Sequence, residues 1–163
     1  MSKIDIPPFD IITGDAIPFD GFGNIIEDKK NVEISFIKVF KEVSERIRDI
    51  FDLDLDCENI DVVTDLENII SQMWLEGWDP EVGDYNLFTR DFGSILAREI
   101  KSQLGGEYIF RSRKRLDYMS IFWKEKKVEA FPFFKVLKRL FNKDGESLIY
   151  FFNSLRKIIV DNH

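Results

Sequence analysis

The chain has 163 residues, a net charge of −7 at pH 7 and a hydrophobic fraction of 44%, which predicts one domain with a sizeable core. It contains a single cysteine, Cys57, and a single histidine, His163. These counts leave too few ligands for a structural zinc site and no partner for an internal disulfide. They also argue against Ser-His-Asp and Cys-His catalysis, which needs an imidazole held beside the nucleophile.

The start of the chain lacks a basic region followed by an apolar run, so we expect no secretion signal. The single cysteine fits a reducing compartment, most simply the cytoplasm. Uninterrupted apolar stretches are only a few residues long, whereas a bilayer span needs about 20. We therefore expect a soluble cytoplasmic protein without a cofactor or a bound metal.

Residues 1–31 are expected to form an extended arm that packs on a single domain covering residues 32–163. Three prolines disfavour regular strand pairing in the arm. A repeated Pro-Phe-Asp sequence places Phe9 and Phe19 for two successive pockets of the domain. An arm that binds a partner is the alternative interpretation.

Two helices are predicted before residue 80. Apolar residues recur every three or four positions over residues 32–51, as in an amphipathic helix. The sequence Thr64-Asp65-Leu66-Glu67 has the form of a capping box and predicts the start of the second helix. Gly77 should end that helix, because glycine adopts the left-handed conformation that closes many helices.

Three strands are predicted within the second half of the chain, over residues 107–112, 116–123 and 127–131. A helix ending at Gly105 precedes them, a helix opened by Pro132 follows them, and a last helix runs from about Leu148. The predicted fold class is α+β, a three-stranded antiparallel meander flanked by about five helices. The expected core includes Phe92, Ile95, Leu96, Phe133, Leu137, Phe152 and Leu155, and Gly93 is expected to allow a neighbouring element to pack closely.

Turn and core residues of the second half carry a resemblance to a group of known domains. They are Phe92-Gly93-Ser94-Ile95-Leu96, Leu104-Gly105-Gly106-Glu107-Tyr108, Phe131-Pro132-Phe133, Val136-Leu137-Lys138-Arg139-Leu140 and Gly145-Glu146-Ser147-Leu148. Residues 85–155 thereby resemble small bacterial α+β domains of unknown biochemistry. The resemblance implies an α+β fold and a place among bacterial accessory or toxin-immunity proteins, and it transfers no active site.

Charge is divided unevenly along the chain. Residues 1–84 hold 21 acidic and 7 basic side chains, a net charge of −14, and residues 85–163 hold 9 and 16, a net charge of +7. Seven acids fall within residues 49–65, which contain no Lys or Arg: Asp49, Asp52, Asp54, Asp56, Glu58, Asp61 and Asp65. Alternation over residues 52–58 predicts a strand or turn with its carboxylates on one side.

A calcium loop is one interpretation of this acidic run, since Asp52, Asp54 and Asp56 match the first three ligand positions. It fails further along, because Cys57 replaces the required glycine and Val63 the closing glutamate. Carboxylates that block strand pairing at an edge explain the same run without a metal.

Two other segments offer alternative functions. Glu76, Asp79 and Glu81 lie beside Trp74 and Trp78, which suits a carbohydrate-active enzyme but equally suits an ordinary loop after a helix. Basic residues of the meander alternate with aromatic ones, as in proteins that bind single-stranded nucleic acid: Arg111, Arg113, Lys114, Arg115, Lys124, Lys126 and Lys127. A sequence pI near 4.8 weighs against the second function, because nucleic-acid-binding domains commonly have a pI above about 9.

The preferred interpretation is a non-catalytic protein-binding domain. Its acidic run would accelerate association with a basic partner, such as a nuclease-type toxin whose own site must bind phosphate. Such a domain would be an immunity or inhibitor protein. The competing interpretation is that these acids only keep a Phe-rich domain in solution.

Overall fold

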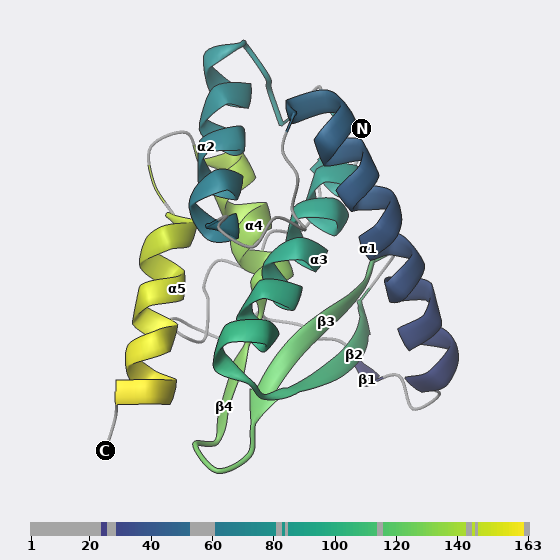
Figure 1. Ribbon diagram of the computed structural model, residues 1–163, viewed down its shortest axis with the longest axis vertical. Helices are drawn as coiled ribbons and strands as arrows, with labels where there is room; N and C mark the ends of the chain where they lie inside the picture. Colours follow the sequence, from purple (N-terminus) through teal and green to yellow (C-terminus); the bar gives the residue numbers. More distant parts are fainter. Residues whose placement is uncertain are drawn as a thin grey trace.

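The computed structural model describes residues 24–25, 29–52, 61–80, 83, 85–113, 116–142, 145 and 147–161. Most of the predicted arm, including Phe9 and Phe19, lies outside these residues. The elements in chain order are β1 (Asn24–Ile25), α1 (Lys29–Phe51), α2 (Val62–Leu75), α3 (Tyr85–Leu104), β2 (Glu107–Arg113), β3 (Leu116–Trp123), β4 (Val128–Ala130), α4 (Pro132–Phe141), α5 (Leu148–Arg156) and the π-helical turn η2 (Lys157–Asp161). The predicted α+β fold is confirmed (Figure 1).

The three predicted strands form an antiparallel meander, and each lies within one residue of its expected bounds. The β2–β3 pairing runs from Glu107 opposite Phe122 to Arg113 opposite Leu116. The two-residue strand β1, which the sequence did not predict, adds a fourth strand at the β2 edge. β1 therefore lies at the edge of the sheet, a few residues before α1 in the sequence.

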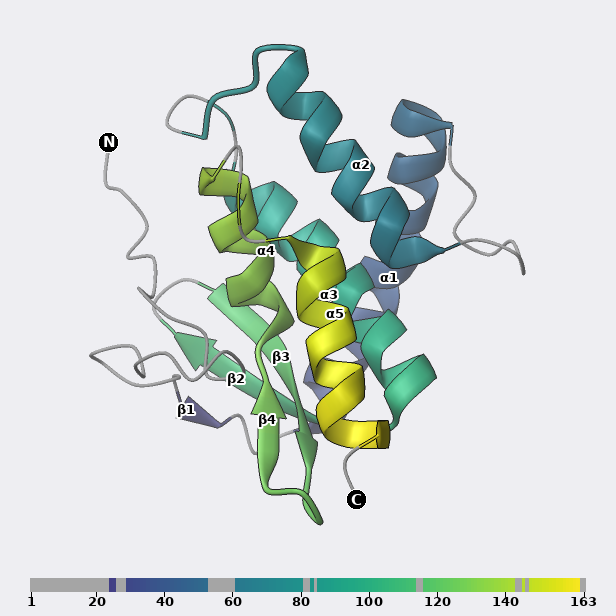
Figure 2. The ribbon, with the colours of Figure 1, turned by 90° about the vertical axis from the view of Figure 1, so that its left-hand side faces the viewer.

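Helices cover the sheet in layers around α3. Phe36 of α1 stacks on Phe110 of β2 with ring centroids 5.6 Å apart, so α1 packs against the sheet. Figure 2 shows α5 nearest the viewer, α3 behind it and α1 farthest away. Because α3 lies between other helices, its residues 91–97 are all buried.

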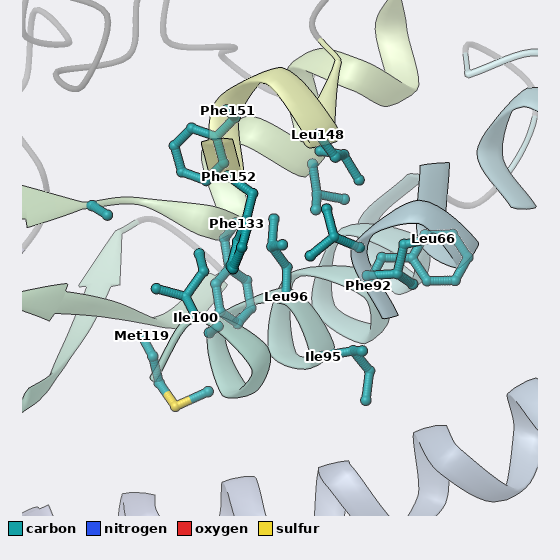
Figure 3. Packing of buried hydrophobic residues seen from close by; sticks show 14 of the residues in the cluster. Leu66, Phe92, Ile95, Leu96, Ile100, Met119, Phe133, Leu148, Phe151 and Phe152 are labelled. Carbon is teal, nitrogen blue, oxygen red and sulfur yellow. The ribbon is translucent and has the colours of Figure 1, made fainter. Parts of the chain in front are cut away.

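The predicted core is confirmed, since all seven expected residues are buried. Figure 3 shows Leu96 and Ile100 of α3 on the side of Phe133 of α4 and Phe152 of α5, and Phe92 beside Leu66 of α2. Gly93 permits a close approach, because a Cβ atom there would lie 2.8 Å from the Phe133 ring and 3.1 Å from the Phe133 Cα atom. Backbone proximity of α3 and α4 therefore depends on the missing side chain, as the sequence predicted.

The start of α2 differs from the prediction. Asp61, not Thr64, is the N-cap, and its carboxylate accepts the Thr64 amide at 3.2 Å and the Thr64 hydroxyl at 2.7 Å. The capping-box interpretation was wrong because Glu67 binds Arg139 of α4 instead of returning to the helix start. Aspartate is among the strongest N-cap residues, so the helix begins earlier.

Gly77 ends α2 as predicted. Its φ angle is +90°, and its amide donates to the Trp74 carbonyl at 3.1 Å. The Trp78 amide donates to the Met73 carbonyl at 2.9 Å, which completes a Schellman motif.

None of the described helices has the combination of length and apolar character that a bilayer crossing requires.

Candidate functional site

The junction between α1 and α2 carries the acidic run, and we call its acids the acidic corner. The described members are Asp49, Asp52, Asp61 and Asp65. The remaining members, Asp54, Asp56 and Glu58, lie outside the described residues, as does the alternating segment that contains them. In Figure 2 the end of α1 and the start of α2 lie on the same side of the molecule. The described acids thus flank residues 53–60, at the end of α1 and at the start of α2.

Exposure and charge distinguish the members of the acidic corner. Asp49, Asp52 and Asp61 are exposed, whereas Asp65 is half-buried. Hydrogen bonds from the Thr64 hydroxyl and amide lower the pKa of Asp61. Burial raises the pKa of Asp65, and the negative charge of Asp61 raises it further. The carboxylates at the start of α2 therefore repel one another, so a cation bound there would relieve that repulsion.

A groove opens beside Asp61, with a volume of about 260 Å³. It lies between the start of α2, the last turn of α3 and one side of α5. The residues that line it are Asp61, Val63, Thr64, Gln103, Ile149, Phe152, Asn153 and Arg156. Val63 and Phe152 are buried, so the groove has an apolar floor between polar rims.

Arg156 forms the basic rim of the groove. Its Nη2 atom donates to Gln103 Oε1 at 2.8 Å, and its guanidinium carbon lies 5.1 Å from the centroid of the Phe152 ring. These contacts hold the guanidinium in place. Arg156 also contributes a small part of the lowering of the Asp61 pKa, which indicates that opposite charges face each other across the groove.

Acids in the interior are paired, unlike those of the acidic corner. Asp91 is 3% exposed, and its carboxylate contacts Arg46 of α1 at 2.9 Å and Arg90 at 3.1 Å. Burial raises the pKa of Asp91, and the two guanidinium groups act in the opposite direction. Arg111 and Glu129 form a second pair across the sheet, with Arg111 Nε 2.9 Å from the carboxylate. The acids of these pairs, Asp91 and Glu129, contribute little charge to the outer surface.

A third buried pair joins α2 to α4. Arg139 Nε lies 3.1 Å and 3.2 Å from the two carboxylate oxygens of Glu67, and Arg139 Nη2 donates to Ser71 Oγ at 2.8 Å. The Leu148 amide at the start of α5 also donates to Glu67, at 3.3 Å. This pair fixes the position of α2, at whose start Asp61 and Asp65 lie.

The loop around Glu76, Trp78 and Asp79 does not present an exposed aromatic surface on which a sugar ring could stack. Trp74 and Trp78 are half-buried and meet edge to face with centroids 5.7 Å apart, and Trp78 packs in the same way on Phe88 at 6.0 Å. Glu76 and Asp79 are exposed, and Glu76 accepts a hydrogen bond from Gln72. Glu81 lies outside the described residues. The rings thus serve the packing between α2 and α3.

The basic meander is divided between the core and one turn. Three of its aromatic residues, Phe110, Tyr118 and Trp123, are buried. The side chains of Arg113, Lys114 and Arg115 lie outside the described part of the chain. Lys124, Lys126 and Lys127 are exposed in the β3–β4 turn. The predicted alternation of stacking rings and phosphate-binding cations therefore does not form one surface within the described residues.

Within the described part of the chain, no three His, Cys, Asp or Glu residues are grouped so that they could hold a metal ion. No protein family model, curated protein sequence or solved structure matches the chain. The resemblance of residues 85–155 to bacterial immunity-like domains therefore stays a prediction.

The groove was not predicted from the sequence. Its basic rim has a weak sequence signal, since Asn153 and Arg156 lie three residues apart on the polar side of the last helix. Nothing local links them to Gln103 or to Asp61.

Proposed function

We propose that the protein is a non-catalytic binding domain that presents the acidic corner to a basic protein partner, as an immunity or inhibitor protein does. One observation carries the proposal: Asp49, Asp52 and Asp61 are exposed in a stretch without Lys or Arg, whereas the acids of the interior are paired with arginines. Like charges gathered on one surface favour association with the opposite charge. A cytoplasmic bacterial protein is the context that this function implies.

The physical role of such a surface lies mainly in the association rate. Complementary charge steers the encounter and excludes partners of the same sign, and it is screened over about 8 Å at physiological salt. Binding that uses the acidic corner should therefore be fast at low salt and should slow steeply as salt rises.

The test compares two variants with equal net charge. One carries Asp49→Asn, Asp52→Asn and Asp61→Asn in the acidic corner. The control carries Glu76→Gln, Glu107→Gln and Glu125→Gln, three exposed acids that lie neither on α1 nor at the start of α2. The probe is a 20-residue polylysine peptide, and the association rate is measured by stopped-flow fluorescence over a range of salt concentrations.

We expect the corner variant to associate several times more slowly than the wild type and to depend less on salt, with circular dichroism unchanged. The control variant should stay close to the wild type. Equal effects of both variants would show that net charge alone attracts the peptide, and the acidic corner would then only aid solubility.

The exposed lysines of the β3–β4 turn support a second candidate, binding of single-stranded nucleic acid. A variant with Lys124→Ser, Lys126→Ser and Lys127→Ser is titrated with labelled oligothymidine. Salt-dependent binding that this variant loses would favour the second candidate over the first.

A further inference from the structure

The groove beside the acidic corner has the features of a site for one extended side chain. Its floor consists of Val63, Ile149 and Phe152, and Phe152 is buried. Its rims are polar, with the Asp61 carboxylate at one and the Arg156 guanidinium at another. A ligand that fits must offer an apolar stem together with a polar end.

Asp61 retains acceptor capacity toward this groove. An ionised carboxylate has about four lone-pair positions. Thr64 occupies one on each oxygen, through its amide on Oδ1 and its hydroxyl on Oδ2, and the Val63 amide also donates to this carboxylate. Since Asp61 is exposed, the remaining positions can accept hydrogen bonds from a cation outside the chain.

Arg156 and Asn153 supply donors at the basic rim. A guanidinium carries five N–H groups, and the contact with Gln103 uses Nη2. A main-chain carbonyl of an extended segment can accept from the others, and from the Asn153 amide that lines the groove one turn earlier. An acidic side chain at the Asp61 rim would instead be repelled by that carboxylate.

Lysine and arginine combine an apolar stem with a charged end that can reach a carboxylate. We propose that the groove binds one Lys or Arg side chain of the basic partner, with its cation on Asp61 and a neighbouring main-chain carbonyl on Asn153 and Arg156. This inference rests on the proposed function. It adds a specific contact between Asp61 and one side chain of the partner to the long-range attraction by the acidic corner.

The experiment is a double-mutant cycle that combines a substitution in the protein with the replacement of arginine by uncharged citrulline in a peptide. The probes are acetyl-Gly-Gly-Arg-Gly-Gly-amide and the same peptide with citrulline, which keeps the shape and loses the charge. Both are titrated by NMR into the ¹⁵N-labelled full chain as wild type, Asp61→Asn and Asp49→Asn. Asparagine is as good an N-cap as aspartate, so Asp61→Asn keeps α2 intact. Asp49→Asn removes the same charge from a residue that does not line the groove.

We expect saturable shifts of the Asn153 and Gln103 side-chain amides with the arginine peptide. Asp61→Asn should weaken its binding about fivefold, and Asp49→Asn less than about 1.5-fold, as for a local pair and a distant charge at the surface. The citrulline peptide should bind more weakly and should not respond to Asp61→Asn. Equal effects of the two variants, or equal binding of the two peptides, would overturn the inference.

A second variant, Asn153→Trp, fills the groove without changing the charge. It should abolish the amide shift of Gln103 with the arginine peptide while leaving the salt-dependent association with polylysine unchanged. If arginine-peptide binding survives this variant, the groove is not the site, and the proposed function still stands on the polylysine result. If the substitutions in the acidic corner leave the association rate with polylysine unchanged, the proposed function itself fails.

Discussion

Replacing Glu67 with leucine should destabilise the protein strongly, because the charge of Arg139 stays buried after it loses the Glu67 carboxylate. The Arg139 side chain is 4% exposed and that of Glu67 is 15% exposed, so water cannot take over the lost contact. Breaking a buried pair from one side costs about 3–5 kcal/mol. The Leu148 amide also loses its acceptor, which places Glu67→Leu toward the upper part of this range.

Replacing both partners should restore most of the stability. In the double variant Glu67→Leu with Arg139→Met, no charge remains buried and the apolar side chains occupy a similar volume. Such exchanges are commonly neutral or stabilising. We expect the double variant to lie within about 1 kcal/mol of the wild type, which gives a coupling free energy of at least about 2 kcal/mol.

Urea unfolding followed by far-UV circular dichroism measures these differences. With a slope of about 2 kcal/mol per molar urea, Glu67→Leu should lower the unfolding midpoint by about 2 M. A loss below about 1 kcal/mol for Glu67→Leu, or strict additivity in the double variant, would refute the buried pair as the link between α2 and α4.

Three further predictions concern single side chains. Gly93→Ala should cost about 1–3 kcal/mol in thermal unfolding, because its Cβ would lie 2.8 Å from the Phe133 ring, and Gly145→Ala, with no atom within 4 Å, is the matched control. Phe92→Ala should cost about 3–5 kcal/mol, and a smaller loss in urea unfolding would contradict its burial at 1% exposure. Burial raises the pKa of Tyr108 from 10.0 to about 12, so the stability that its neutral phenol provides is lost between those pH values as the unfolded chain ionises first. Tyr108→Phe should flatten the fall in stability over that pH range and remove one late phase from the absorbance titration at alkaline pH.

Elements with a clear period were predictable from the sequence. The apolar spacing of α3, its end at Gly105 and the aromatic strands that follow depend on local rules that tertiary packing reinforces. The cap of α2 was not predictable in this way. Two candidate caps, Asp61 and Thr64, lie three residues apart, and the choice depends on Glu67, whose partner Arg139 is 72 positions away.

The candidate site also has one part that depends on neighbouring residues in the sequence and one part that depends on distant residues. The acidic corner could be predicted because its members are contiguous in the sequence. The groove could not, since it brings together Asp61, Gln103 and Arg156 from three elements. Only the packing of α5 beside α2 and α3 places these side chains around one space.

Two ion pairs among the described residues join the halves of the chain, and together they do not reduce the difference in charge. Arg139 of the second half binds Glu67 of the first, but Arg46 of the first half binds Asp91 of the second, so these two contacts run in opposite senses. Together they leave the difference in charge between the halves unchanged. The acids at the end of α1 and the lysines of the β3–β4 turn also lie toward opposite ends of the molecule (Figure 1). Acids outnumber Arg48 at the end of α1, and three lysines outnumber Glu125 in the β3–β4 turn. Because screening acts over about 8 Å, a partner near either end responds mainly to the sign that prevails there, which gives the molecule a direction of approach that its net charge alone does not.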